Sequence, residues 1–389
     1  MCPAESIVKI VQVNYAYTGQ ISDHAALLDA YETLTGWSEA VAGAGAEVSV
    51  VQAFHYDARL TRNGIDYLFC AADRPSDGSV RPRWRRPRAL EAAVLAAKPD
   101  VVHVNSLDFA PEIWLLRRAL PPHVPLVVQD HADALPRSFS LKGAVRRRLL
   151  AAADAFLFTA VEQSVPWRTN GFISERQRVY AVLESSTTLT PMDPDTARSI
   201  SRVQGSPAVL WVGRLNTAKD PITVLQGFEQ ALDVLPDACL TMVYGEDELL
   251  PAVRRRVSDS PALARSVRLV GPVPHRQMAA FYSAADLFVL GSAHEGSGYS
   301  LIEACACGAV PVVTNIPSFR VMTDRGAIGV LWSHGDPSAC AHAIVDAARR
   351  DRDEERQRVL RHFGQHLSWS VVGAQALAIY QDVRATRRA

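Results

Sequence analysis

Two glutamates, Glu295 and Glu303, flank a stretch of glycine, serine and other small residues where an apolar run gives way to a helical pattern. The run 287–290 is typical of a buried parallel strand, and residues 300–307 are typical of a helix start. The N–H groups of a helix N-terminus bind phosphate, whereas carboxylates accept hydrogen bonds from hydroxyl groups. A ligand carrying both phosphate and sugar would suit these residues, with Glu303 facing a ribose and Glu295 a second sugar. The alternative is a loop charge and a solvated helix residue.

Two cations follow another apolar run, at 208–212. Gly213 and Arg214 come directly after this run, and Lys219 follows a few residues later. Gly213 would permit a tight turn at the carboxyl edge of a sheet, where open α/β domains bind ligands. Arg214 and Lys219 would then converge on one diphosphate. Ordinary surface charges explain this segment equally well when it is taken alone, but the two glutamates favour a binding site.

Short apolar runs alternate with amphipathic, alanine-rich segments along the whole chain. This alternation predicts an α/β protein with two Rossmann-like, doubly wound parallel-sheet domains. The expected strands are 8–13, 47–53, 101–105, 126–129, 155–159 and 179–183 in the first half, and 208–212, 239–244, 267–269, 287–290, 310–314 and 330–332 in the second.

The boundary between the two domains is expected in the segment 185–207, which is rich in Ser, Thr, Pro and Asp and has no strand pattern. The expected division is therefore an N-terminal domain over residues 1–190 and a C-terminal domain over residues 191–369. Residues 370–389 have the pattern of a C-terminal helix, which could pack back on the N-terminal domain.

Composition limits the classes of function. The 389 residues are enough for two domains, and 41 Lys and Arg balance 41 Asp and Glu, so no overall field attracts nucleic acid or a membrane. Of the six cysteines only Cys305 and Cys307 are close together, and on a helix their side chains would diverge, unlike a metal pair. Reduced thiols, with neither a signal-peptide pattern nor a long apolar run, predict a cytoplasmic protein.

Two pairs of carboxylates resemble metal ligands but are expected to bind none. Asp193 and Asp195 stand in the segment between the domains, and Asp351 and Asp353 stand in a heavily charged helix. Two basic clusters, Arg81–Arg88 and Lys142–Arg148, would suit a lipid-linked acceptor and peripheral membrane contact. A solvated loop and a solvated helix face are the alternative that we favour, because no matching apolar stripe accompanies them.

With these motifs the chain resembles the retaining GT-B glycosyltransferases of glycosyltransferase family 4. The resemblance covers the whole second half and, more loosely, the first half. The matching motifs are Gly213-Arg214 with Lys219, Gly271-Pro272-Val273, residues 282–289, Glu295 to Glu303 with residues 308–313, Gly335-Asp336-Pro337, and Ser368-Trp369. It implies two Rossmann-like domains facing a central cleft, and transfer of a sugar from a nucleoside diphosphate donor to a hydroxyl acceptor.

The resemblance also implies roles for residues of the second half. Arg214 and Lys219 would hold the donor diphosphate, Glu303 the ribose hydroxyls, and Glu295 the transferred sugar. The backbone of Val273 would contact the base. The phosphate cradle would be completed by the backbone of Gly298, Tyr299, Ser300 and Leu301.

In the first half, His131 follows the run 126–129 and matches the strand-end histidine that lies near the sugar and the reacting bond in this family. A lone structural histidine is the alternative. With Glu295, His131 is the expected catalytic residue. The chain departs from the family pattern in three places: residues 14–20 contain only Gly19, with Thr35-Gly36 coming later; residues 180–187 replace the usual Asn-Gly turn between the domains; and Ser297 replaces a commonly aromatic residue.

No metal or other cofactor is expected, because Arg214, Lys219 and a helix N-terminus would supply the positive potential beside the leaving diphosphate. The acceptor would be a glycan, a lipid-linked molecule or a small molecule, and uridine diphosphate sugars are the first donors to test. Two other classes stay open. A nucleotide-sugar epimerase would share the fold but need no acceptor, and a catalytically silent homologue would bind nucleotide without turnover.

Overall fold

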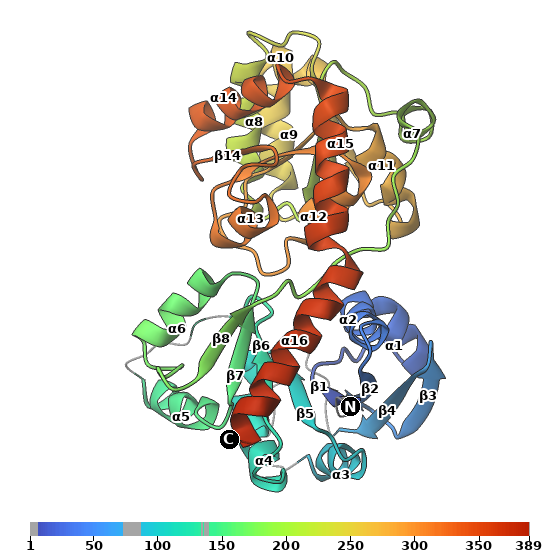
Figure 1. Cartoon of the computed structure of the whole chain (residues 1–389). Coiled ribbons are helices and arrows are strands. Elements are labelled where there is room, and N and C mark those ends of the chain that lie inside the picture. Colours follow the sequence, from blue (N-terminus) through green and yellow to red (C-terminus); the bar gives the residue numbers. More distant parts are fainter. Residues whose placement is uncertain (1–6, 73–86, 134, 136–139, 389) are drawn as a thin grey trace, which may run out of the picture. The chain divides into compact units, whose positions relative to one another are not determined.

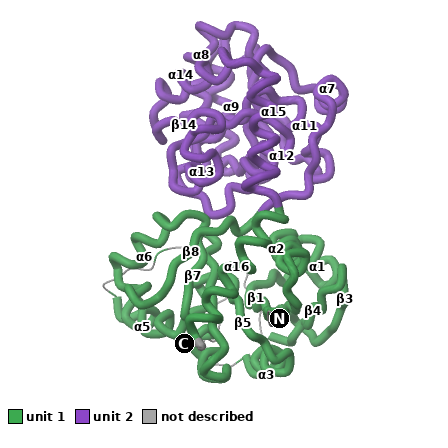
Figure 2. Tube along the Cα trace, in the orientation of Figure 1, with its two compact units in different colours: residues 1–185, 369–389 green, residues 186–368 purple. Residues whose placement is uncertain are grey.

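The computed structural model in Figure 1 describes residues 7–72, 87–133, 135 and 140–388. The chain forms two compact units: unit 1 comprises Met1–Ser185 and Trp369–Ala389, and unit 2 comprises Ser186–Ser368 (Figure 2). The chain thus first passes from unit 1 to unit 2 after Ser185, whereas the sequence analysis places the domain boundary after residue 190. The final helix α16 (Trp369–Arg388) belongs to unit 1. No helix among the described residues is long and apolar enough to cross a membrane.

Unit 1 contains an eight-stranded sheet in the order β3-β4-β2-β1-β5-β6-β7-β8. All neighbouring strands are parallel except β3 and β4. From β1 the chain first builds the sheet on one side and then returns to add β5 on the other, so the strand order reverses between β1 and β5. The strands are β1 Lys9–Asn14, β2 Glu47–Phe54, β3 Ala58–Arg62, β4 Ile65–Ala71, β5 Val101–Asn105, β6 Leu126–Gln129, β7 Ala155–Phe158 and β8 Arg178–Ala181.

The sequence analysis did not predict the hairpin that β3 and β4 form. Its turn is Asn63-Gly64, and both residues have positive φ, 52° and 78°. Asn-Gly is the strongest short-range signal for a two-residue hairpin, because these residues tolerate left-handed backbone at low cost. The signal was therefore present in the sequence. β3 lacks the apolar pattern of a strand because none of its residues is buried; they alternate between half-exposed and exposed.

The helices of unit 1 include α16, which packs along α2. A Cβ atom at Gly36 would lie 2.4 Å from the ring of Trp369, and one at Gly373 would lie 2.1 Å from the Ala40 carbonyl oxygen. Two glycines therefore let these helices approach closely. Besides α16, the α-helices of unit 1 are α1 His24–Ala30, α2 Glu32–Gly43, α3 Arg88–Ala96, α4 Ala110–Ala119, α5 Leu141–Leu150 and α6 Val165–Thr169.

A buried polar cluster also connects α16 to the sheet of unit 1. The Trp37 indole N–H donates to the Tyr380 hydroxyl oxygen at 3.1 Å, and that oxygen lies 2.6 Å from Nδ1 of His103. Burial lowers the pKa of His103 to about 3, so this ring is neutral. His103 is therefore a core residue that anchors α16.

Unit 2 contains a fully parallel six-stranded sheet in the order β11-β10-β9-β12-β13-β14. Its strand order reverses between β9 and β12. The strands are β9 Ala208–Gly213, β10 Cys239–Tyr244, β11 Val267–Gly271, β12 Leu287–Leu290, β13 Val310–Thr314 and β14 Val330–Trp332. The helices are α7 Pro194–Ser201, α8 Pro221–Ala231, α9 Leu250–Ser258, α10 Pro261–Ser266, α11 Met278–Ala284, α12 Tyr299–Cys307, α13 Pro317–Met322, α14 Pro337–Ala348 and α15 Arg352–His362.

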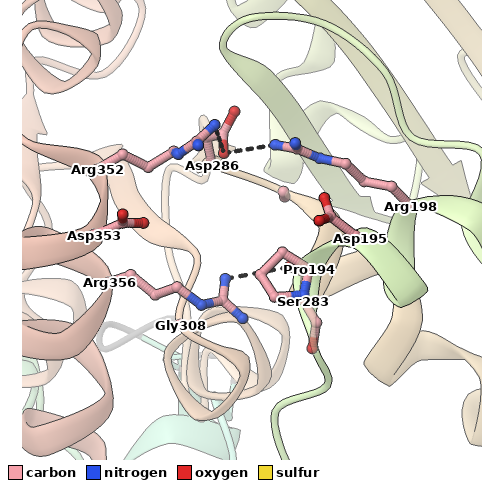
Figure 3. A pocket seen from close by; sticks show the side chains of 10 residues that line it. Pro194, Asp195, Arg198, Ser283, Asp286, Gly308, Arg352, Asp353 and Arg356 are labelled. Atoms are coloured by element: carbon pink, nitrogen blue, oxygen red, sulfur yellow. Dashed lines mark hydrogen bonds and ion pairs between the residues drawn. The ribbon is translucent and has the colours of Figure 1, made fainter.

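A small polar pocket lies beside the amino end of β12 (Figure 3). Asp286, directly before this strand, accepts a hydrogen bond from the Ala208 N–H at 2.8 Å and pairs with Arg198 at 3.0 Å and Arg352 at 3.4 Å. Three arginines and three aspartates line the pocket, so their formal charges cancel. These contacts tie α7 and α15 to the sheet, and the family motif residue Asp286 is structural.

Candidate active site

The reversal of strand order in unit 2 brings a partly buried ion pair together. Lys219 ends a short 3-10 helix (Thr217–Lys219) that follows β9, and Glu295 stands in the loop that follows β12. The Lys219 Nζ pairs with the Glu295 Oε1, and their side chains are only 13% and 11% exposed. Open α/β sheets bind ligands at the carboxyl ends of the two strands where the order reverses. The structure thus unites two residues that the sequence predicted from separate motifs.

Local hydrogen bonds hold the Glu295 loop in place. The Ser292 hydroxyl donates to Glu295 Oε1 at 2.6 Å, and the Thr314 hydroxyl donates to the Ser292 carbonyl oxygen at 2.6 Å. The Ala293 N–H donates to the Ala218 carbonyl oxygen at 3.0 Å. This last bond connects the loop after β12 directly to the segment that carries Lys219. The carboxylate is therefore held by Ser292 from its own loop and by Lys219 from the segment after β9.

Helix α12 begins beside this loop. Gly298 is its N-cap with φ of 53°, and Tyr299, Ser300 and Leu301 form its first turn. A Cβ atom at Gly298 would lie within about 3.1 Å of Phe319 and Met322, so both conformation and space favour glycine here. No side chain of the N-cap residue satisfies the first amides of α12. The Leu301 N–H, which the sequence analysis assigned to the phosphate cradle, already donates to the Gly298 carbonyl oxygen at 2.9 Å. The start of α12 and its dipole are nevertheless suited to an anion.

Arg214 and Gly213 differ from the sequence expectation in part. Arg214 directly follows β9, and its side chain is 58% exposed. Its Nη1 lies 3.7 Å from Oε1 of Glu246. Gly213 is the last residue of β9 and has no positive φ. A tight turn follows it directly, where the Asn216 N–H donates to the Arg214 carbonyl oxygen at 2.9 Å. A Cβ atom at Gly213 would lie 3.2 Å from the Trp211 ring and 3.7 Å from Lys219 Cγ. The tight approach is therefore to the Trp211 ring, whereas Lys219 would be at ordinary contact distance.

Glu303 lies on α12 with a side chain that is only 4% exposed. Its Oε1 lies 2.5 Å from Nε2 of His275, and its Oε2 accepts a hydrogen bond from the Tyr282 hydroxyl at 2.8 Å. Burial and then the Glu303 charge raise the pKa of Tyr282, so this hydroxyl stays a donor. His275 stands two residues after Val273, in the segment that follows β11. The sequence analysis missed His275, for which no motif gave a signal.

In unit 1, His131 lies at the carboxyl end of β6. Its Nδ1 is 2.7 Å from Oε2 of Glu184, which follows β8, and the two side chains are 28% and 6% exposed. Burial lowers the pKa of His131, but the carboxylates of Glu184, Asp133 and Asp130 outweigh burial and raise it overall. The sequence analysis predicted His131 but not its partner Glu184.

Two aspartates beside His131 shape the same strand end. Asp133 accepts hydrogen bonds from the Ser106 hydroxyl and the Leu107 N–H, both at 2.7 Å. Asp130 accepts from the backbone N–H groups of Ala132 at 3.2 Å and Asp133 at 3.1 Å. Burial, with the nearby charges of Asp133 and Glu184, raises the pKa of Asp130 to about 7. His131 therefore stands in a strongly acidic environment.

The family's glycine-rich loop is replaced here by one that side chains hold. The Asn14 amide donates to Gln52 Oε1 at 2.8 Å, and the Gln52 amide donates to the Ala16 carbonyl oxygen at 2.8 Å. Tyr17 is buried, and its hydroxyl donates to the Ala72 carbonyl oxygen at 3.2 Å. Thr35 and Gly36 lie within α2, away from any loop.

The carboxylate pairs considered as metal ligands contain helix caps. Asp193 accepts a hydrogen bond from the Thr196 N–H at 2.9 Å, and Asp351 accepts from the Glu354 N–H at 2.8 Å. Within the described part of the chain, no group of three or more His, Cys, Asp and Glu residues could hold a metal ion. Of the first basic cluster, Arg81 to Arg86 lie outside the described residues, and Arg88 begins α3.

Two family descriptions match the chain. "Glycosyl transferases group 1" matches residues 193–362, which lie in unit 2, and "Glycosyltransferase Family 4" matches residues 33–164, which lie in unit 1. A D-inositol 3-phosphate glycosyltransferase of Xylanimonas cellulosilytica is 29% identical over 336 residues, 77% of each chain. The GDP-mannose:cellobiosyl-diphosphopolyprenol alpha-mannosyltransferase of Xanthomonas campestris is 26% identical over 298 residues, covering 74% of this chain and 76% of that protein.

Solved structures share the fold over nearly the whole chain. The sucrose-phosphate synthase of Thermosynechococcus elongatus has a TM-score of 0.68 at 18% identity and covers 97% of this chain and 100% of its own. Anabaena HepE, in complex with UDP and glucose, has a TM-score of 0.68 at 16% identity and covers 96% of this chain and 100% of its own. The fold expected from the sequence is confirmed, and the relatives named above favour transfer over the epimerase and silent-homologue alternatives. The chain therefore belongs to glycosyltransferase family 4 and is a GT-B glycosyltransferase.

Proposed function

We propose that the protein transfers a sugar from a nucleoside diphosphate sugar to a hydroxyl acceptor, with retention of anomeric configuration and without a metal ion. The observation that carries this proposal is the partly buried pair of Lys219 and Glu295, at the reversal of strand order and beside the N-terminus of α12. The site offers a cation and helix amides for phosphate, and a carboxylate for sugar hydroxyls.

Departure of the nucleoside diphosphate breaks the bond between the anomeric carbon and a phosphate oxygen, which then carries new negative charge. Lys219 and the amides of α12 stabilise that charge, and Arg214 adds to the positive potential from its exposed position. The acceptor oxygen attacks the same face of the sugar, and the leaving phosphate oxygen takes the proton of the acceptor. Glu295 orients the sugar, and no nucleophilic role is assigned to it.

Donor binding requires an exchange of partners at this pair. Lys219 is now neutralised by Glu295, so a diphosphate that binds Lys219 competes with this carboxylate. The exchange is favourable when the sugar hydroxyls give Glu295 new hydrogen bonds, because a buried carboxylate is costly without partners. A complete nucleotide sugar binds both residues, whereas a free diphosphate binds Lys219 and offers Glu295 no new hydrogen bonds.

Glu303 and the segment after β11 are proposed to bind the nucleoside. The buried carboxylate of Glu303 can accept hydrogen bonds from ribose hydroxyls, and the backbone at Val273 can contact the base. His275 and Tyr282 hold Glu303 on this side of α12. They keep it oriented, since each contacts a different carboxylate oxygen.

The donor base and the acceptor are chosen for testing from the relatives. HepE was solved with UDP and glucose, the Xanthomonas relative is named for GDP-mannose and a polyprenol-linked acceptor, and others are named for inositol 3-phosphate. We favour a uridine diphosphate sugar as donor. The first panel should therefore combine UDP- and GDP-sugars with inositol phosphates and polyprenyl diphosphate glycans.

The deciding assay measures release of nucleoside diphosphate with and without each acceptor. Transfer predicts release that depends on the acceptor, together with a glycosylated product whose anomeric configuration matches that of the donor. Conversion of the donor alone into a second nucleotide sugar would instead reveal an epimerase. Binding of nucleotide without release under any combination would reveal a silent homologue.

The exposed face of α5 is a reason to test a membrane-associated acceptor, because it adds two exposed apolar residues to a basic cluster for which the sequence showed no apolar stripe. Leu141 is 84% exposed and Val145, one turn later, is 51% exposed, and the exposed side chains of Lys142 and Arg148 flank them. Apolar residues edged by cations suit a bilayer that contains anionic lipids.

Vesicle sedimentation tests this surface. The protein should sediment with vesicles containing phosphatidylglycerol but not with neutral phosphatidylcholine vesicles, and Leu141→Ser should reduce sedimentation. Val234→Ser, at a 52% exposed position of unit 2, is the control. Equal sedimentation of the Leu141 variant and the wild type would show that the α5 face does not bind the vesicles.

A further inference from the structure

The contact between His131 and Glu184 joins two strand ends of unit 1. His131 follows β6 and Glu184 follows β8, with β7 between them in the sheet. Because these strands are parallel, their carboxyl ends lie at one edge, and the residues meet there with Nδ1 and Oε2 2.7 Å apart. Glu184 is only 6% exposed, so its carboxylate depends on such a partner.

The contact decides which ring nitrogen carries a proton. Glu184 Oε2 has no other hydrogen-bond partner among the described residues, and its contact with Nδ1 is an ion pair at 2.7 Å. Because an ionised carboxylate can only accept hydrogen bonds, this close approach favours a proton on Nδ1 of His131 whether the ring is neutral or cationic. Nε2 is then the nitrogen left to interact with another molecule. This atom is buried and has no hydrogen-bond partner among the residues that the structure describes.

We propose that Glu184 is a positioning residue for His131. Its carboxylate binds the Nδ1 proton and fixes the plane of the ring, so that Nε2 of His131 faces the substrate. The proposal takes His131 as the catalytic residue expected from the sequence, and it rests on the proposed function in requiring sugar transfer. Glu184 lies in the segment that replaces the usual Asn-Gly turn of this family. A carboxylate in this segment can stabilise an imidazolium.

The surrounding charges favour a cationic ring. Glu184 faces His131 from the end of β8, while Asp130 and Asp133 face it from the end of β6, and all three carboxylates raise its pKa. His103 on β5 is the opposing titratable neighbour, but burial keeps that ring neutral. Loss of the Glu184 charge should therefore let His131 lose its proton at lower pH.

The direct test is histidine NMR of the full chain, with His131 assigned by the signal that disappears in His131→Ala. Glu184→Gln keeps an acceptor for Nδ1 but removes the charge, so the proton should stay on Nδ1 while the measured pKa falls. Glu175→Gln, at a 91% exposed side chain of unit 1, should leave the titration unchanged. An unchanged His131 pKa in Glu184→Gln would overturn the proposal.

A double-mutant cycle on transfer separates positioning from a merely structural role. Glu184→Gln should lower kcat about tenfold through loss of a coupled contact, with KM for the donor nearly unchanged. The alkaline limb of its pH profile should move to lower pH, and Glu184→Asp should restore part of the rate. In a His131→Ala background, Glu184→Gln should have no further effect.

Additive losses in that cycle would show that Glu184 acts independently of His131 and would overturn its positioning role. Equal melting temperatures of the variants ensure that the rates compare folded proteins. If no donor and acceptor give transfer in the wild type, the proposed function fails, but the NMR titration still decides whether Glu184 holds the ring.

Discussion

Glu295 and Glu303 have different partners, so their roles can be separated by substitution. Glu295 neutralises Lys219, whereas Glu303 is held by His275 and Tyr282. Glu295→Ala should leave affinity for free nucleoside diphosphate no weaker than in the wild type, because it removes a carboxylate that competes for Lys219. Transfer should fall severely, since the sugar loses its orientation.

Glu303→Gln should weaken both the free diphosphate and the nucleotide sugar, by about 1.5–3 kcal/mol for a lost charge-assisted hydrogen bond. Glutamine is the better replacement because it leaves an acceptor for Tyr282. Calorimetric titration of both variants with diphosphate and with donor provides the comparison. An equal loss of diphosphate affinity in the two variants would contradict the separate roles.

The raised pKa of Asp130 gives a pH prediction. Its ordinary value of 3.8 rises to about 7 in the fold, so the folded state holds a proton that the unfolded state has already released. Stability from this group is present at acid pH and is lost as pH rises from about 4 through about 7. Asp130→Asn should therefore flatten the fall in melting temperature over this range. Asp29→Asn, at a 70% exposed side chain, should keep the wild-type slope, and two equal slopes would refute the assignment.

At the scale of elements, the close approach of α2 and α16 gives a stability prediction. Gly373→Ala would place Cβ 2.1 Å from the Ala40 carbonyl oxygen, so α16 must shift, at a cost of about 1–3 kcal/mol for overpacking. Gly364→Ala is the control, because its Cβ would meet no atom within 4 Å. Urea denaturation should show a lower midpoint for Gly373→Ala alone. Equal midpoints would mean that α16 does not pack tightly on α2.

The elements that the sequence predicts well are those with a local signal. Buried parallel strands such as β12 are continuous apolar runs, and the motifs at Lys219 and Glu295 directly follow two of them. The contact between these two residues depends on β9 and β12 being neighbours, which the strand order decides. Glu184 and His275 were missed because their partners lie far away in sequence, and neither stands in a motif of its own.

At the scale of the whole molecule, transfer should survive an excess of chelator. Lys219, Arg214 and the amides of α12 are assigned the positive potential that a divalent ion would otherwise supply. Rates measured in EDTA should therefore equal those in buffer alone. Loss of sugar transfer in EDTA, followed by recovery with added magnesium or manganese, would show that a metal ion supplies this positive potential.

The central claim is that unit 2 binds the donor diphosphate through Lys219, and calorimetric titration with nucleoside diphosphate tests it most directly. Lys219→Met should weaken binding by about 1.5–3 kcal/mol, the usual value of a charge-assisted contact. The double variant Lys219→Met/Glu295→Gln should still bind the diphosphate weakly, since it also removes the carboxylate that Lys219 neutralises in the wild type. Arg265→Ala, at an exposed cation of α10, should bind like the wild type. Wild-type affinity in the double variant would contradict the account.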